Sequence, residues 1–130
     1  GDATLGHEDA VIVLLGANDR LRLSNSGDFK REAESYLNRI AARYGADNVY
    51  VLANIDTLSD PRSLTMGQEN TVLQDLCRRH GWRFASMYSA FRIVGRPTGM
   101  PQQALYKDGI HPNRMGQVVM WRALQQLLGL

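Results

Sequence analysis

The chain has 130 residues, of which 44% are hydrophobic and 22% charged, and a formal net charge of +2. This length predicts a single domain, and the scattered basic residues form no stripe that would favour nucleic-acid binding. The lone cysteine, Cys77, excludes a disulfide within the chain, and no apolar run approaches the ~20 residues that a transmembrane helix needs. No charged-then-apolar leader opens the sequence, but a leader can be removed on secretion, so no compartment is indicated.

The first half of the chain alternates apolar runs with amphipathic stretches. Residues 10–15 are continuously apolar and rich in β-branched side chains, which is typical of a strand buried on both faces of a parallel sheet. The run ends in a turn-forming cluster at residues 16–19. Apolar side chains at helical spacing from Phe29 to Tyr44 predict a helix that ends at Gly45, and residues 48–53 predict a second strand.

The second half continues the same alternation. Thr65 and Gln68 could form a capping box at the start of a second main helix. Residues 82–87 predict a short third strand, residues 95–109 a Gly/Pro-rich loop, and residues 115–128 a last helix closed by Gly129. Strands that alternate with helices indicate parallel β-α units.

The segment Asp108-Gly-Ile-His111-Pro112-Asn113 carries the clearest chemical signal. A histidine that acts as a general base needs a partner that holds its ring in one tautomer and stabilises the imidazolium, and Asp108 can reach His111 across one turn. Pro112 has a fixed φ that suits the start of a helix. The alternative is purely structural: an aspartate turn and a histidine packed before a proline-started helix.

Two segments together resemble the third and fifth sequence blocks of the SGNH (GDSL-type) hydrolases. They are Gly16-Ala17-Asn18-Asp19, after the first strand, and Asp108-x-x-His111-Pro112, before the last helix. The resemblance implies a three-layer α/β/α sandwich with a flavodoxin-like parallel sheet, of which three strands and three main helices are expected here. It also implies hydrolysis of an acetyl or other small acyl ester, carried by a glycan, a lipid or a small molecule, through an acyl-enzyme and without metal or organic cofactor.

The resemblance assigns a role to each matching residue. Asn18 matches the amide that donates to the oxyanion, Gly16 the glycine that lets the chain turn beside the substrate, His111 the general base, and Asp108 its orienting partner. The position of Asn18 also fits general rules, since ligands of doubly wound sheets bind at the carboxyl ends of strands. The alternative for Asn18 is a turn residue that tolerates left-handed geometry. Asp19 is expected to bond loop amides rather than to act as an acid.

The serine block of these hydrolases, and the block with a second oxyanion glycine, are not found in this sequence. Residues 1–6 resemble the serine block faintly, with Ala3 in place of serine, but only residues 6–9 separate it from the next strand, whereas a β-α-β unit takes ~30 residues. No serine lies in a nucleophile context; the positions are Ser24, Ser26, Ser35, Ser59, Ser63, Ser86 and Ser89.

We therefore expect residues 1–130 to form a single partial domain without the N-terminal strand-helix-strand segment. A complementary polypeptide segment would supply the serine, and the chain alone would be inactive and would expose an apolar sheet edge that favours aggregation. The competing hypothesis is a non-catalytic binding or structural domain on the same scaffold, which Ala3 in the serine position would support.

Other conspicuous residues are assigned no chemistry. His7-Glu8-Asp9 lacks the spacing of metal ligands and is expected to be a solvated run. Cys77 fits the apolar stripe of a helix, and His80 ends that helix, where a cation suits the dipole. Three residues in or near the loop before Asp108 are expected at its surface, with the alternative that they shape a substrate pocket; they are Arg92, Arg96 and Tyr106.

Overall fold

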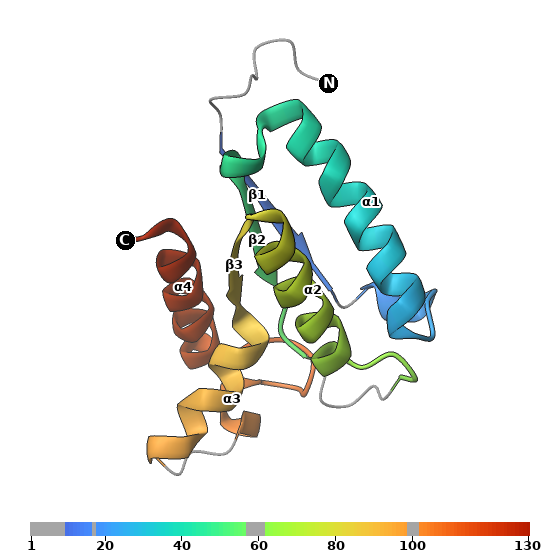
Figure 1. The fold of residues 1–130 in the computed structure, drawn as a ribbon. Coiled ribbons are helices and arrows are strands. Elements are labelled where there is room, and N and C mark those ends of the chain that lie inside the picture. The colour runs from blue at the N-terminus through green and yellow to red at the C-terminus, as the bar shows by residue number, and fades with distance from the viewer. Residues whose placement is uncertain (1–9, 17, 57–61, 99–101) are drawn as a thin grey trace.

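The computed structural model describes residues 10–16, 18–56, 62–98 and 102–130, with side chains outside the description at residues 18, 21, 94–98, 102 and 103. Within these ranges a parallel sheet has the order β1 (Val11–Leu15), β2 (Val49–Ala53), β3 (Arg83–Ser86) (Figure 1). The longer helices are α1 (Ser26–Tyr44), α2 (Met66–His80), α3 (Met87–Thr98) and α4 (Arg114–Leu128), and the 3₁₀ turns are η1 (Asn18–Leu21), η2 (Ala46–Asn48) and η3 (Gln102–Leu105).

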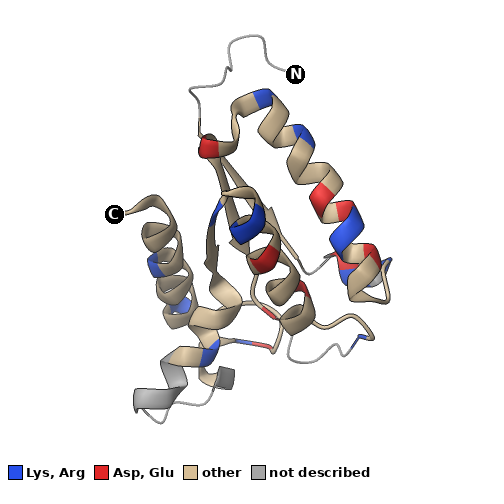
Figure 2. Ribbon diagram, in the orientation of Figure 1, with Lys and Arg blue, Asp and Glu red and all other residues tan. Residues whose placement is uncertain are grey.

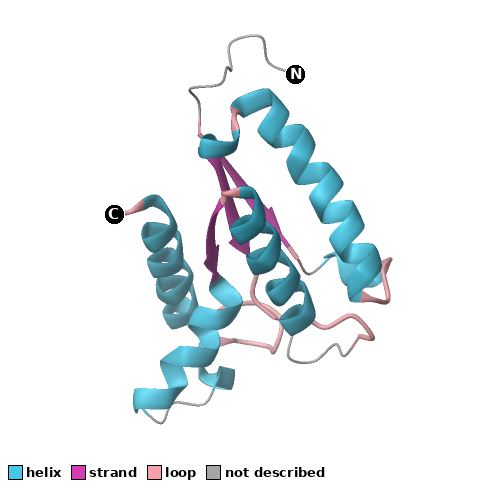
Figure 3. Cartoon of the chain, viewed as in Figure 1, coloured by secondary structure: helices cyan, strands magenta, loops and turns pink. Residues whose placement is uncertain are grey.

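The elements form three layers, as Figure 3 shows, and this confirms the predicted α/β fold class. Helices α1 and α2 cover one face of the sheet over a core that includes Val13, Leu37, Val51 and Leu73. Helix α4 and the start of α3 cover the other face over a second core. Charged residues lie along the helices, whereas β1 and β2 carry none (Figure 2).

Helix ends follow the local sequence. Asn25 caps α1 by accepting a hydrogen bond from the Asp28 backbone N–H at 2.8 Å. The predicted capping box at the start of α2 is confirmed, because Thr65 and Gln68 each bond the other's backbone N–H. Gly129 ends α4 in the left-handed conformation, as expected of a C-terminal glycine. Among the described residues, no helix combines the length and the apolarity that crossing a bilayer demands.

Helix α3 corrects the prediction of three main helices and of a loop that begins at residue 95. The structure begins this helix at Met87, directly after β3, and continues it to Thr98 despite Gly95 and Pro97. Met87 and Phe91, one helical turn apart, are both buried in the second core, so tertiary packing outweighs the poor helix propensity of the segment.

Strand β1 is not buried on both faces, contrary to the sequence-based expectation. Val13 packs under α1, but Ile12 and Leu14 point to the other face and are 47% and 54% exposed. Helix α4 packs over β2 and β3, and an open apolar groove remains between β1 and α4, lined by Leu14, Leu52 and Trp121 among others. Ile12 and Leu14 thus lie exposed on an outer strand of the described sheet, while the expectation of a partial domain stays a prediction.

Candidate active site

The carboxyl ends of the strands and the N-termini of α1, α2 and α4 meet at one end of the sheet, at the bottom of Figure 1. The chain leaves β1 at Gly16, whose φ of +115° favours glycine. A Cβ added there would lie 2.4 Å from Met66 Cε, so a larger residue would require the Met66 side chain at the start of α2 to shift. The Asn54 backbone N–H donates to Leu15 O at 2.9 Å, which joins the last residue of β1 to the residue that follows β2.

Asn18 begins η1 at this end of the sheet, as the sequence predicts for a residue that follows the first strand. Its side chain and all of Ala17 lie outside the described residues, so the oxyanion role of Asn18 stays a prediction.

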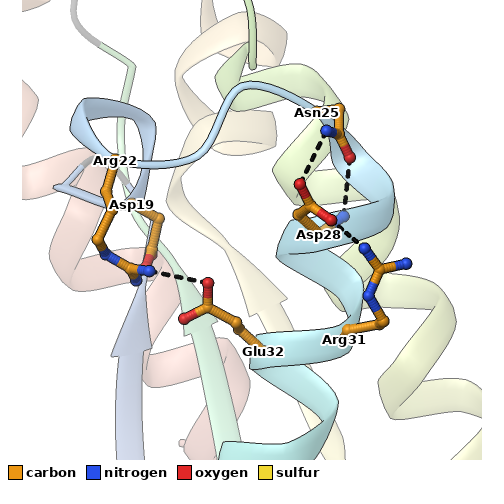
Figure 4. Close-up of polar contacts among 6 residues, drawn as sticks. All are labelled: Asp19, Arg22, Asn25, Asp28, Arg31 and Glu32. Carbon is orange, nitrogen blue, oxygen red and sulfur yellow. Dashed lines mark hydrogen bonds and ion pairs between the residues drawn. The ribbon is translucent and has the colours of Figure 1, made fainter.

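The expectation for Asp19 is wrong in its detail. The backbone carbonyl of Asp19, rather than its side chain, accepts hydrogen bonds from the N–H groups of Arg22 and Leu23, at 3.2 and 2.8 Å. Its carboxylate instead forms an ion pair with Arg22 at 3.7 Å (Figure 4).

Asp108 and His111 form a hydrogen-bonded dyad in the turn before α4. His111 Nδ1 lies 2.7 Å from Asp108 Oδ2. The other carboxylate oxygen, Oδ1, accepts from the backbone N–H groups of Ile110 and His111 at 2.9 and 2.6 Å. The side chains of Asp108 and His111 are 47% and 65% exposed, so the dyad is open to solvent on this surface.

The hydrogen bonds of Asp108 determine the tautomer of His111. The backbone N–H of His111, the imidazole of His111 and the backbone N–H of Ile110, in that order, hold the pKa of the Asp108 carboxyl well below its usual range. An ionised carboxylate accepts hydrogen bonds and cannot donate them. Nδ1 of His111 therefore carries the proton and donates to Asp108, which leaves Nε2 with a free lone pair that can accept one.

Asn113 fixes the turn that carries the dyad. Its side-chain amide donates to Ala104 O at 2.6 Å and to Tyr106 O at 3.4 Å, and its side-chain oxygen accepts from the Gly116 N–H at 2.9 Å. Asn113 is thus the N-cap of α4, which begins at Arg114. The prediction that Pro112 starts this helix is wrong, because Pro112 precedes the cap and instead pairs with Tyr106 in an isolated antiparallel bridge.

The burial and the contacts of Tyr106, close to the dyad, are what sequence reasoning missed. It was expected at the loop surface, but it is buried, and its ring packs edge-on against Phe91 at a centroid distance of 5.4 Å. Its hydroxyl donates to Asp56 O at 2.8 Å, beyond the end of β2. Arg92 lies exposed on α3 over the Tyr88 ring, and the side chain of Arg96 lies outside the described residues.

The hydroxyl of Ser86, at the carboxyl end of β3, makes structural hydrogen bonds. It donates to Asn70 Oδ1 and accepts from the Ser89 backbone N–H at 2.9 Å. The side-chain amide of Asn70 in turn donates to Ser89 Oγ at 3.3 Å. Neither hydroxyl contacts an imidazole among these bonds, so these two serines link α2 to the start of α3 rather than serve as a nucleophile.

Cys77 and His80 have structural surroundings. Cys77 is in the first core, as predicted, and burial raises the pKa of its thiol to about 12. His80 stacks on Trp82 with the ring centroids 4.2 Å apart, and its Nε2 lies 2.7 Å from Glu34 Oε2. In the described part of the chain, no three His, Cys, Asp or Glu side chains gather in a way that could hold a metal ion. Residues 7–9 and Ala3 lie outside that part.

Solved structures of other proteins resemble the fold of this chain. An acetylxylan esterase from Geobacillus stearothermophilus matches the fold with a TM-score of 0.75 and 19% identity, over 94% of this chain and 60% of the esterase. A protein described as a GDSL-like lipase from Parabacteroides merdae matches with a TM-score of 0.71 and 16% identity, over 93% of this chain and 60% of its own. The chain thus spans about 60% of the length of these proteins.

Catalytic mutants of the esterase carry alanine in place of a serine, an aspartate or a histidine. No curated protein matches the chain at a significant level. The sequence profile of the GDSL-like lipase/acylhydrolase family matches residues 1–119, which is most of the chain. The chain therefore belongs to the GDSL-like lipase/acylhydrolase family.

Proposed function

We propose that this chain carries the general base and its orienting carboxylate of a serine esterase that acts on an acetyl or other small acyl ester. The 2.7 Å contact between His111 Nδ1 and Asp108 Oδ2 carries the proposal. The acetylxylan esterase supports it, since the aspartate and histidine of its catalytic mutants lie three positions apart, as Asp108 and His111 do.

In the proposed mechanism, His111 Nε2 takes the proton of a serine hydroxyl as its oxygen attacks the acyl carbonyl carbon. Asp108 stabilises the imidazolium that forms. The imidazolium then protonates the leaving alcohol, and an acyl-serine remains. Water attacks the acyl-serine with His111 again as the base, which releases the acid and restores the serine.

Asn18 has the oxyanion role in this proposal. Its side-chain amide would donate to the oxygen that becomes negative as the tetrahedral intermediate forms, and Gly16 leaves room for close approach of the substrate. Such a donor suits the task because it stabilises negative charge without titrating, and loss of one typically costs roughly 10²–10³ in turnover. None of these steps requires a metal ion or an organic cofactor.

We propose further that a complementary polypeptide segment supplies the serine from a strand that pairs with the edge of β1 that no other described strand occupies. The exposed side chains of Ile12 and Leu14 and the apolar groove beside Trp121 support this. Helices α1 and α2 cover one face as the chain proceeds from β1 to β3. A right-handed crossover from β1 in the opposite direction, away from β2, would put its helix on the other face of the sheet. The exposed side chains of Ile12 and Leu14 lie on that face.

Replacement of His111 tests the catalytic part of the proposal. In the complete, serine-containing protein, His111→Ala is expected to abolish hydrolysis of p-nitrophenyl acetate while the circular dichroism spectrum stays unchanged. His80→Ala is the matched control, because His80 ends α2 at the opposite end of the sheet and contacts Glu34 and Trp82. Unchanged turnover in His111→Ala removes this histidine from the mechanism.

A fluorophosphonate label tests the source of the nucleophile, since it reacts with an activated serine. Residues 1–130 alone are expected to stay unlabelled, and the complete protein to be labelled once, on the complementary segment. A complete protein that takes no label favours the non-catalytic alternative. A monodisperse, cooperatively unfolding monomer of residues 1–130 contradicts the need for a complementary segment.

A further inference from the structure

A cluster of buried charges lies beneath the loop that follows β1. Arg20 of η1 forms ion pairs with Asp56, at 3.5 Å from Nη1, and with Glu69, at 3.7 Å from Nε. The side chain of Arg20 is 6% exposed and that of Glu69 is fully buried. Three segments meet in this cluster: η1, the residues after β2, and the first turn of α2.

The same cluster reaches the turn of the dyad through one residue. The backbone carbonyl of Asp56 accepts the Tyr106 hydroxyl at 2.8 Å. The residue after Tyr106, Lys107, donates its N–H to His111 O at 3.0 Å. A continuous set of contacts therefore leads from Arg20, two residues after Asn18, to the backbone of His111.

Stability alone is a poor explanation for this cluster. Removing charges from water costs several kcal/mol per ion, and buried ion pairs often add no net stability over apolar residues of similar volume. What a buried arginine provides is geometry, because its planar guanidinium is rigid and carries the charge over three nitrogens, so that Nη1 and Nε each face one carboxylate at ion-pair distance, 3.5 Å from Asp56 and 3.7 Å from Glu69. A lysine at this position would offer a single point charge.

We propose that Arg20 is a positioning residue, which holds η1 and the His111 turn at a fixed spacing through Asp56 and Tyr106. This inference rests on the proposed function, since the spacing it sets is that between Asn18 and the general base. Misplacement of a catalytic group by 1 Å can cost ~10²-fold in rate. Arg20 therefore affects the rate of the chemical step without touching substrate.

Arg22 provides a matched control in the same loop. Its side chain is 61% exposed and forms ion pairs with Glu32 at 2.8 Å and with Asp19 at 3.7 Å, beside α1 (Figure 4). These partners lie at the surface and contact neither Asp56 nor Tyr106 through any of these bonds. Removal of Arg22 thus removes a charge of the same kind from the same loop while the link to His111 stays intact.

The test measures kcat and KM of the complete protein with p-nitrophenyl acetate, per mole of folded enzyme. Arg20→Met is expected to lower kcat about 10- to 100-fold with little change in KM, because alignment rather than binding is lost. Arg20→Lys should recover part of this loss. Arg22→Met should keep kcat within about twofold of the wild type, as is usual for an exposed ion pair.

A double-mutant cycle separates positioning from a general loss of stability. Tyr106→Phe removes the hydroxyl bond to Asp56 and keeps the ring, so its losses in kcat should overlap with those of Arg20→Lys rather than multiply. The kcat losses of Tyr106→Phe and Arg22→Met should instead multiply when the two substitutions are combined. If Arg20→Met fails to fold, the double-mutant cycle with Arg20→Lys still tests whether Arg20 acts through Tyr106.

Two results overturn the inference. The first is a wild-type kcat in Arg20→Met while His111→Ala is inactive. If the methionine variant does not fold, a wild-type kcat in Arg20→Lys counts in the same way. This result leaves the proposed function standing. The other is losses in Arg20→Lys and Tyr106→Phe that multiply as independent effects do. A complete protein that neither hydrolyses the ester nor takes the fluorophosphonate label overturns the proposed function, and the positioning role with it.

Discussion

The substitution Asp108→Asn tests the tautomer argument most directly. Asparagine keeps the shape of aspartate, so its carbonyl oxygen can continue to accept from the N–H groups of Ile110 and His111, now at 2.9 and 2.6 Å. Its NH₂ group would stand where Oδ2 lies 2.7 Å from His111 Nδ1. An NH₂ group only donates, so Nδ1 must accept and the ring proton moves to Nε2. The nitrogen that should take the serine proton is then already protonated.

The expected loss follows from this exchange and from the exposure of the pair. In serine proteases, where the aspartate is buried, the same replacement lowers turnover about 10⁴-fold. Here the two side chains are 47% and 65% exposed, so water can compete for the imidazole and weaken the preference for one tautomer. We expect a smaller loss in kcat, of about 10²–10³-fold.

The assay is hydrolysis of p-nitrophenyl acetate by the complete protein, together with ¹⁵N NMR of the His111 ring to report the tautomer. Asp108→Ala is the comparison, because it removes the acceptor without forcing the proton onto Nε2. The asparagine variant should thus be at least as impaired as the alanine variant, with Nε2 protonated in the spectrum. An asparagine variant that keeps its turnover, or that keeps the proton on Nδ1, refutes the reasoning.

Three further predictions concern the complete protein. Gly16→Ala should lower the free energy of unfolding by at least about 2 kcal/mol in urea, because it combines left-handed strain with a clash; Gly81→Ala, which has φ of +76° and open space around it, should cost only about 1 kcal/mol. Cys77 should stay unreactive to Ellman's reagent until the protein unfolds, since burial raises its pKa to about 12. The hydrogen bond from His80 lowers the pKa of Glu34, so the stability that Glu34 adds is present above the ordinary glutamate pKa of about 4.3 and lost as pH falls through the lowered value. The Tm of Glu34→Gln should therefore lie below that of the wild type at neutral pH, and the difference should shrink as the pH falls through the lowered pKa of Glu34.

These three predictions have clear contrary outcomes. Equal losses in Gly16→Ala and Gly81→Ala would show that the contact with Met66 relaxes freely. Rapid labelling of Cys77 in the native protein would mean that its helix opens readily. A Tm difference for Glu34→Gln that grows at acid pH would reverse the sign expected of a lowered carboxyl pKa.

The sequence predicted the elements whose periodicity and caps agree. The apolar runs at β1 and β2, the helical stripe of α1 and the capping box at Thr65 all lie where expected, because each needs only its own neighbours in the chain. Helix α3 was missed for the opposite reason. Its glycine, proline and β-branched residues predict a loop, and only the packing of Met87 and Phe91 on the sheet makes the helix favourable.

The features of the candidate site likewise fall into those that the sequence could predict and those that it could not. The Asp108–His111 contact was predictable, because three residues of a turn set it, whatever the rest of the fold does. The burial of Tyr106 and its bond to Asp56 join residues 50 positions apart, and no local pattern signals such a pairing. The exposure of Ile12 and Leu14 was unpredictable from their own run, since it depends on where α4 packs.

The position of Asn113 should be unusually intolerant of substitution. An ordinary helix start accepts serine, threonine or aspartate, because each supplies an oxygen for the free N–H groups. Here the Asn113 side chain donates hydrogen bonds to two carbonyls and accepts one from the Gly116 N–H. Among the common capping residues, only asparagine has both an NH₂ group with two donors and an acceptor oxygen. A saturation library at this codon, selected for esterase activity, should therefore return asparagine almost alone.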